Sequence, residues 1–482
     1  MKKVDYSALL LLGPILLACY FGYVWREYQL DDALIYLRYI KNFQEGHGLV
    51  YNPGERFNGL TSPFFTFVIL LGSFLVKSLQ WLSVVTSVCF LVATAYLSAK
   101  LFACSRFGQL LTMFAIVGFG YFYSTIGMET PLFLLFIVLS LYLYKIDSDY
   151  VVISLALLVI TRSEGIFLAA PICIDYLTRH KRLPKPAFIL SGLVLLVLPF
   201  IFNKFYYGDF LAVTGSAKIG QGKSGFWGYG WIFFQAEHLF GFFSGNRYIA
   251  AALLGFAFLG AILLRNNRIA IISLIFVISL LGFYGLLNIP NYHWYYAPFF
   301  LFALIFASFA IEWLTLKCWQ AKWLSPQGIA IITLIFCMGF YFKNTLPWES
   351  GYKNEAYIQM GKWLKANTPE NSSVAMVEVG TVGWYADRRI IDILGLTNPH
   401  NADYIAKGDV HSWPKHYQPD YILCHNPLWI HETVAQYLED SGAYAPVPNF
   451  HFPGYVLLYK TGKHPDDQIA KIPAVIKQRQ QK

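Results

Sequence analysis

Two adjacent carboxylates, Asp31 and Asp32, stand where the chain leaves its first hydrophobic stretch. A carboxylate at a membrane surface is a candidate general base, because it can take the proton from an attacking hydroxyl group. Residues 32–45 alternate apolar and polar side chains at helical spacing, which predicts an amphipathic helix along the interface. One aspartate is expected to cap this helix. The other remains for chemistry, and Asp31 is preferred because it shares the polar face with Arg38.

The loop after this helix, "GHGLVYNPGERFNGLTSP", contains an Asn-Pro-Gly turn and several polar side chains. Its polar side chains include His47, Asn52 and Glu55. The simpler interpretation is that the loop is only rich in turns.

Arg162 and Glu164 lie in "TRSEG", which divides the apolar stretch 150–174 into two short pieces. Two short crossings are compatible with a membrane if their connection lies in a polar cavity that is buried in protein. The sequence therefore predicts such a cavity around Arg162 and Glu164. Glu129, in "GMET", lies in another of the predicted outer loops.

The segment "AKIGQGKS", residues 217–224, fits a relaxed phosphate-loop pattern, but such a loop needs a preceding strand and a following helix. We expect instead a flexible basic lid, from which Lys218 reaches an anionic head group. In "NYHWYYAP", Trp294 and Tyr296 are typical of aromatic residues at a membrane interface. His293 is less usual there and is a candidate for holding a phosphate or transferring a proton.

The composition predicts a polytopic membrane protein. The 482-residue chain is 56% hydrophobic and 13% charged, whereas a soluble chain carries about 25% charged residues. Residues 1–342 hold the whole net charge of +9, because residues 343–482 contain 14 basic and 14 acidic side chains. Such an excess in membrane loops sets orientation, whereas nucleic-acid binding would need a basic face on a soluble domain. The seven cysteines show no metal-ligand spacing.

The uncharged runs predict the membrane spans, because a spanning helix needs about 20 apolar residues. All basic clusters fall on the cytoplasmic side only if residues 63–76 form an outer juxtamembrane helix. This arrangement predicts about eleven spans, with a retained N-terminal anchor that starts in the cytoplasm. The long runs are 7–24, 79–99, 107–128, 187–203, 248–264, 269–287, 294–311 and 323–342, and the shorter ones are 63–76, 130–144, 150–161 and 165–174.

Beyond the membrane domain, residues 1–342, the chain predicts a separate α/β domain over residues 343–462. Helix-like stretches there alternate with short apolar runs such as "SSVAMVEVG" and "YVLLYK". The predicted topology puts this domain in the periplasm. The tail, residues 463–482, is expected to be mobile.

The run "DDALIYLRYIKNFQEGHGLVYNPGERFNGLTSPF" resembles the first outer loop of GT-C glycosyltransferases. The resemblance is to the bacterial terminal arabinofuranosyltransferases and their type IV pilin-glycosylating relatives. "GMETPLF", "TRSEG", "YYGDFLAVTGSAK", "YHWYYAP" and "IIDILGLTNP" are similar to further landmarks of this family, in family order. The resemblance covers nearly the whole chain and implies an α-helical GT-C membrane fold. It also implies an inverting transfer of a sugar from a polyprenyl-phosphate donor to an extracytoplasmic acceptor, at the bacterial inner membrane.

These expectations give each candidate residue a role. The general base would be Asp31 or Asp32. The residues expected at the donor phosphate are Arg38, Arg162, Lys218 and His293. The residues expected at the sugar or acceptor are His47, Asn52, Glu55, Glu129, Glu164 and Tyr295. No cofactor is demanded, although paired carboxylates are compatible with a divalent cation.

D-Arabinofuranose is the preferred sugar, and pilin or a surface polysaccharide is the expected acceptor. Another lipid-linked sugar, such as mannose or an aminopentose, is an open alternative. A flippase or transporter of lipid-linked sugars is the alternative from another class. Transporters often carry charges at the midplane and inverted repeats, whereas this chain gathers charges in its predicted outer loops and shows no repeat.

Overall fold

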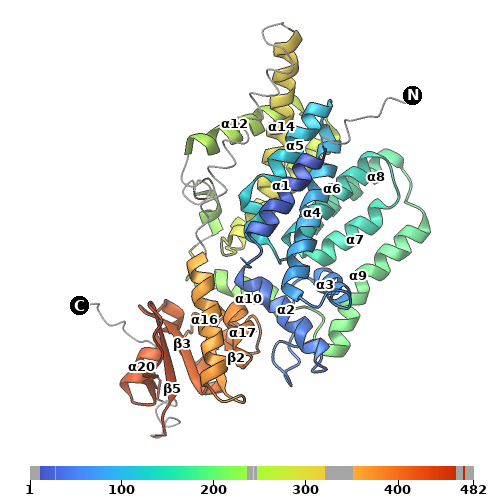
Figure 1. The fold of residues 1–482 in the computed structure, drawn as a ribbon. Coiled ribbons are helices and arrows are strands. Elements are labelled where there is room, and N and C mark those ends of the chain that lie inside the picture. Colours follow the sequence, from blue (N-terminus) through green and yellow to red (C-terminus); the bar gives the residue numbers. More distant parts are fainter. Residues whose placement is uncertain are drawn as a thin grey trace.

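The computed structural model describes residues 11–27, 29–228, 230–235, 241, 243, 247–320, 351–462 and 471–472. Apolar helices form the larger part of the molecule, and a smaller α/β region lies at its lower end (Figure 1). The predicted span 323–342 and the boundary between residues 342 and 343 lie outside the described residues. So does all of the predicted tail, 463–482, except two residues.

The apolar runs form helices, as their lengths and composition predict. Within the described residues, α4, α9, α13 and the stretch His293–Cys318 are long and apolar enough to cross a membrane. The shorter apolar helices have 10–17 residues, so the span count of eleven stays a prediction. The helices are α1 (Leu12–Val24), α3 (Pro63–Ser73), α4 (Leu79–Phe102), α5 (Arg106–Val117), α6 (Thr130–Lys145), α7 (Val151–Thr161), α8 (Ile166–His180), α9 (Pro186–Tyr207), α12 (Arg247–Leu263), α13 (Arg268–Leu286) and α14 (Ala297–Gln320).

Helix α2 (Asp31–Gln44) lies between the apolar helices and the α/β region (Figure 1). All of its residues from Ala33 to Ile40 are buried, because protein covers the face that was predicted to be polar and exposed. The prediction that an aspartate caps this helix is wrong. Its N-cap residue is Leu30, and no side chain makes a cap hydrogen bond there. Both aspartates instead occupy the first helical turn, where the helix dipole favours negative charge.

The uncharged run 107–128 is not one continuous helix. Helix α5 ends at Val117, and the 3₁₀ helix η2 (Gly120–Thr125) follows. Gly127 then adopts a φ of +86°, which glycine reaches without strain. A Cβ at this position would come within 3.1 Å of the Ala33 Cβ. The break therefore lets the loop before α6 pack directly against the start of α2.

The C-terminal residues form the predicted α/β fold around one five-stranded sheet. The strand order is β2-β1-β3-β5-β4. Strand β1 runs parallel to β2 and β3, whereas β5 is antiparallel to β3 and β4. The elements are α16 (Gly351–Asn367), β1 (Ser373–Met376), α17 (Val379–Ala386), β2 (Arg389–Asp392), α18 (Asn401–Ala406), α19 (Trp413–Tyr417), β3 (Tyr421–His425), α20 (Val434–Asp440), β4 (Tyr444–Pro446) and β5 (Tyr455–Lys460).

Candidate active site

A buried ion cluster joins three of the predicted site residues. The Arg162 Nη1 lies 3.0 Å from Glu129 Oε1, and its Nη2 lies 2.8 Å from Glu164 Oε1. The Tyr284 hydroxyl donates a hydrogen bond of 3.2 Å to the same Glu164 oxygen. Arg162 ends α7, and the 3₁₀ helix η3 (Ser163–Gly165) carries Glu164. The interruption in "TRSEG" thus places these charges inside the protein, as the sequence predicted.

The cluster keeps unused hydrogen-bonding capacity. Glu129 Oε2 and Arg162 Nε are buried and have no hydrogen-bond partner among the described residues. Buried polar atoms without partners are costly and rare in native proteins. The Arg162 guanidinium also lies 5.0 Å from the centroid of the Tyr295 ring, so Tyr295 joins the cluster. An anionic ligand beside Arg162 could therefore accept a hydrogen bond from its Nε–H group, which has no partner among the described residues.

Lys218 lies on α10 (Val213–Ser224), which is helical through the whole segment 217–224. The phosphate-loop interpretation is therefore excluded, and the expected lid is a helix. The Lys218 Nζ lies 3.9 Å from the Tyr292 ring centroid. Burial lowers the pKa of Lys218, whereas the carboxylate of Asp32 opposes this shift most strongly. Arg162 also lies within electrostatic range of Lys218, so Asp32, Lys218 and the ion cluster share one region.

Asp32 has the electrostatic surroundings of a general base. Burial raises the pKa of its carboxyl above the ordinary value of 3.8, and the ammonium group of Lys218 acts in the opposite direction. A raised pKa strengthens a carboxylate as a proton acceptor, and the neighbouring cation keeps its ionised form accessible.

Asp31 has a different environment and caps a helix, although not its own. Its carboxylate accepts hydrogen bonds of 2.7 Å from the Gly380 N–H and 2.6 Å from the Thr381 N–H, in the first turn of α17. Burial raises the pKa of Asp31 to about 6, although these backbone donors work in the other direction. A Cβ at Gly380 would overlap the Asp31 carbonyl oxygen, so glycine permits this close approach.

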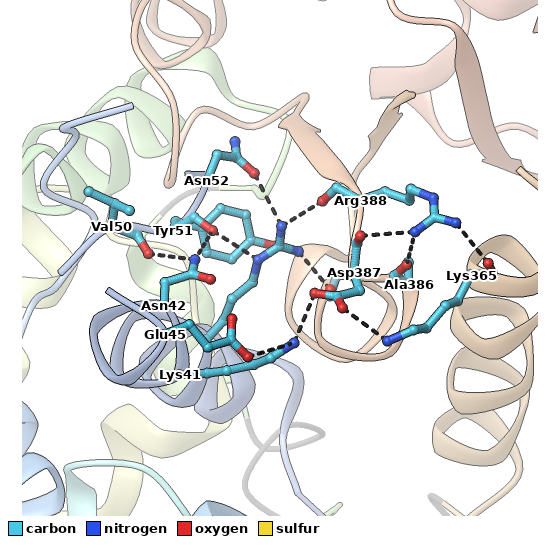
Figure 2. A network of polar contacts seen from close by, with 12 residues as sticks. Lys41, Asn42, Glu45, Val50, Tyr51, Asn52, Lys365, Ala386, Asp387 and Arg388 are labelled. Atoms are coloured by element: carbon cyan, nitrogen blue, oxygen red, sulfur yellow. Dashed lines mark hydrogen bonds and ion pairs between the residues drawn. The ribbon is translucent and has the colours of Figure 1, made fainter. Parts of the chain in front are cut away.

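Arg38 also binds the C-terminal region. Its guanidinium donates to the carbonyl oxygens of Tyr51, Gly383 and Arg388 and to the Asn52 side chain. Figure 2 shows this network. The Arg38 donors are therefore bound to carbonyl and amide oxygens. We therefore assign it to domain docking and not to the donor phosphate.

Asn52 and Glu55 complete the same interface. The Asn52 amide donates 2.8 Å to the Ile390 carbonyl and accepts 3.0 Å from the Ile390 N–H, as a neighbouring strand would. Glu55 forms an ion pair of 2.6 Å with Arg389. His47 is exposed. These placements give Asn52 and Glu55 a docking role in place of the expected contact with sugar or acceptor.

His293 opens the 3₁₀ helix η5 (His293–Tyr296), and its Nε2 lies 3.4 Å from the Ser124 carbonyl oxygen. Its backbone carbonyl accepts a hydrogen bond from Tyr121. The ring therefore contacts η2, and the role of His293 at the donor phosphate stays a prediction.

Tyr36, Tyr284 and Tyr292 belong to the candidate site but were not singled out from the sequence. Tyr36 lies within electrostatic range of Glu129, Arg162 and Asp32, and its hydroxyl is 2.5 Å from Thr61 Oγ1.

The described residues contain no group of three or more His, Cys, Asp or Glu side chains that could hold a metal ion. A cation shared by Asp31 and Asp32 does not fit either, because the Asp31 carboxylate is bound to two backbone N–H groups.

Solved structures with similar folds cover almost the whole chain. ArnT from Cupriavidus metallidurans bound to undecaprenyl phosphate has a TM-score of 0.65 at 11% identity, over 95% of this chain and 99% of that one. Its apo state gives a TM-score of 0.63 at 13% identity, over 96% and 99%. The Archaeoglobus fulgidus oligosaccharyltransferase in complex with Zn and sulfate gives 0.53 at 13% identity, over 89% and 68%.

The chain has the GT-C glycosyltransferase fold. This fold confirms the α-helical architecture that the first-loop resemblance implied, and the small sheet domain confirms the C-terminal α/β fold predicted from the pattern of helices and strands. A family profile described as "Domain of unknown function (DUF8728)" matches residues 347–469, the α/β part of this GT-C protein. No curated protein matches the chain in sequence.

Proposed function

We propose that this GT-C protein is an inverting glycosyltransferase that moves a sugar from a polyprenyl-phosphate donor to an acceptor outside the membrane. The observation that carries the proposal is the buried cluster of Glu129, Arg162 and Glu164, with Asp32 and Lys218 within electrostatic range. This region contains cations that can bind a phosphate and a carboxylate that can take the proton of an acceptor hydroxyl. The fold shared with ArnT, which was solved with undecaprenyl phosphate, supports a donor of this class.

In the proposed reaction, the Asp32 carboxylate takes the proton of the acceptor hydroxyl as its oxygen attacks the anomeric carbon. The bond between this carbon and the phosphate oxygen breaks, and polyprenyl phosphate leaves with the electron pair. Arg162 and Lys218 stabilise the charge that develops on the leaving phosphate. Glu129 and Glu164 fix the Arg162 guanidinium, and Tyr295 packs beside it.

Asp32 is the proposed base in place of Asp31, because each carboxylate has a different partner. Both oxygens of Asp31 already accept backbone hydrogen bonds from α17. Asp32 is instead the carboxylate that acts most strongly on Lys218. Successive residues on a helix point about 100° apart, since one turn takes about 3.6 residues, so the two side chains reach different surroundings.

D-Arabinofuranose remains the proposed sugar, and pilin or a surface polysaccharide the proposed acceptor. We also propose an inner-membrane protein with a cytoplasmic N-terminus, a catalytic membrane domain in residues 1–342 and a periplasmic domain in residues 343–462. Both sugar and acceptor are open to direct assay.

The test is transfer by the purified protein in nanodiscs, with polyprenyl-phosphoryl arabinofuranose, mannose and an aminopentose offered separately. The acceptors are an octyl glycoside and a serine-containing peptide. The proposal predicts a glycosylated product from one donor and release of polyprenyl phosphate in equal amount. Movement of an intact lipid-linked sugar across proteoliposomes, without transfer, would instead establish a flippase.

A further inference from the structure

A small cavity lies in the α/β region, at the carboxyl ends of the parallel strands β1 and β3. Its volume of about 10 Å³ is close to the space that one water molecule requires. In open α/β sheets, ligands bind outside the carboxyl ends of parallel strands. Its polar lining comes from Glu378, His425 and Glu432, with the rings of Tyr357 and Tyr455 beside them.

His425 is held in one orientation by its neighbours. Its Nδ1 lies 2.9 Å from Glu432 Oε1, and the Glu432 side chain is 1% exposed. The other Glu432 oxygen accepts hydrogen bonds from the backbone N–H groups of His425 and Trp429. The imidazole also stacks on the Trp429 ring, with centroids 3.6 Å apart. The carboxylate thus fixes the proton on Nδ1, as in other histidine–carboxylate pairs.

The second ring nitrogen of His425 is left with hydrogen-bonding capacity. Nε2 is buried and has no hydrogen-bond partner within the described residues. With the proton on Nδ1, Nε2 is a hydrogen-bond acceptor. A buried acceptor without a partner favours a ligand that donates, and a hydroxyl group has the size of the water that would fit.

Glu378 connects this cavity with the candidate active site. It is the N-cap residue of α17, directly before the turn that Asp31 holds. Glu378 lines the cavity and also lies within electrostatic range of Lys218 and Tyr292. A molecule that reaches from the cavity past Glu378 therefore approaches Asp32 and Lys218.

We propose that this cavity is an acceptor subsite, in which His425 Nε2 accepts a hydrogen bond from a hydroxyl group of the acceptor. The hydroxyl bound here is not the one that attacks, which lies at Asp32. The subsite orients the acceptor between the two regions. This inference rests on the proposed function, because it assumes that an acceptor is present.

The test compares His425→Ala, His425→Gln and the control His451→Ala, which changes an exposed histidine of the same domain. KM is measured for each substrate, with the octyl glycoside and the serine peptide as separate acceptor probes. Loss of one buried hydrogen bond predicts an acceptor KM about tenfold higher in His425→Ala, with a higher ratio of acceptor KM to donor KM. Partial recovery is expected in His425→Gln, because the amide oxygen can still accept, and no change in His451→Ala. The affected probe tells whether a sugar or a peptide hydroxyl is bound.

Thermal unfolding of each variant separates binding from folding. If folded His425→Ala keeps the wild-type acceptor KM for both probes, the cavity holds a structural water only and the inference is wrong. If the wild-type protein transfers no sugar from any donor, the proposed function is wrong, and so is the acceptor subsite that rests on it.

Discussion

At the scale of single residues, two adjacent carboxylates have different environments. Asp31 binds backbone N–H groups of the C-terminal domain, whereas Asp32 lies within electrostatic range of Lys218. The Asp32 pKa is raised by burial and lowered by this cation. An acidic group whose pKa is set by the opposing effects of burial and a nearby cation is suited to proton transfer.

The raised pKa of Asp32 predicts the pH dependence of transfer. The base must be ionised, so the rate of transfer should fall as the pH drops through a value above the ordinary 3.8. Lys218→Met removes the cation that lowers this pKa and should move the acidic limb to higher pH. The measurement is kcat/KM against pH, with Asp31→Asn as the control that retains the limb. If the acidic limb of Lys218→Met lies at the same pH as in the wild type, Asp32 and Lys218 do not interact as proposed.

Lys218 should contribute to donor affinity. A lost charge-assisted hydrogen bond costs about 1.5–3 kcal/mol, which corresponds to a Kd for polyprenyl phosphate about 10-fold to 100-fold weaker in Lys218→Met. Lys223→Met is the matched control, because Lys223 is exposed on the same helix. Arg162→Ala should weaken binding too, but also lower the melting temperature, since it leaves two buried carboxylates without their cation. Equal donor affinity in wild type and both site variants would rule out this phosphate site.

At the scale of elements, α2 and its following loop serve as a docking surface for the C-terminal domain. Arg38 and Asn52 bind backbone groups on either side of the β2 start. Lys41 and Lys365 both pair with Asp387, at 2.8 and 2.9 Å (Figure 2). Burial would raise the pKa of Asp387, but these two cations set it at about 2. The loop thus positions α17 beside Asp32 and Lys218.

Docking through α17 makes a stability prediction. Asp31→Ala removes a helix cap, which costs about 0.5–2 kcal/mol, and Gly380→Ala should lower stability further because its methyl group overlaps the Asp31 carbonyl oxygen. Gly215→Ala is the matched control, since a Cβ there meets no atom within 4 Å. Thermal unfolding and protease sensitivity of residues 351–462 are the measurements. Unchanged stability in Gly380→Ala would contradict the close contact.

The limits of sequence reasoning follow from these contacts. The helices and the cluster around Arg162 could be predicted, because apolar runs and an interrupting charge are local signals. The long-range partners of Asp31 and Arg38 could not be predicted, because they are backbone groups about 350 positions away. Every residue has such groups, so the sequence does not mark them. The polar face of α2 suggested an interface helix, since a domain surface and water both favour polar residues. Lys218 was found from its charge, but the sequence predicted a flexible lid where the structure has a helix.

At the scale of the whole molecule, α2 and α10, which carry Asp32 and Lys218, lie at the junction between the apolar helices and the α/β region (Figure 1). Helix α2 packs against α17, and α10 packs against α18. Asp32, Asp392 and Glu378 all contribute to the electrostatic surroundings of Lys218. Such a junction allows a lipid-linked donor to approach from the membrane and a polar acceptor from water. The proposed topology puts that water in the periplasm.

The orientation of the protein in the membrane can be tested with single cysteines in a cysteine-free background. Lys181→Cys should be shielded from a membrane-impermeant thiol reagent in intact spheroplasts, because the adjacent basic run is predicted to be cytoplasmic. Lys407→Cys, in the α/β region, should react. Both lysines are exposed, so burial does not separate them. Labelling of Lys181→Cys with protection of Lys407→Cys would invert the topology.

The central claim is that Asp32 removes the acceptor proton, and single-turnover transfer by Asp31→Asn and Asp32→Asn tests it most directly. Loss of a general base predicts that Asp32→Asn is slower by about 10²–10⁴, with donor binding and thermal unfolding close to wild type. Asp31→Asn should lose mainly thermal stability, because its amide oxygen can still accept a hydrogen bond from α17. Transfer by Asp32→Asn at the wild-type rate would contradict the account.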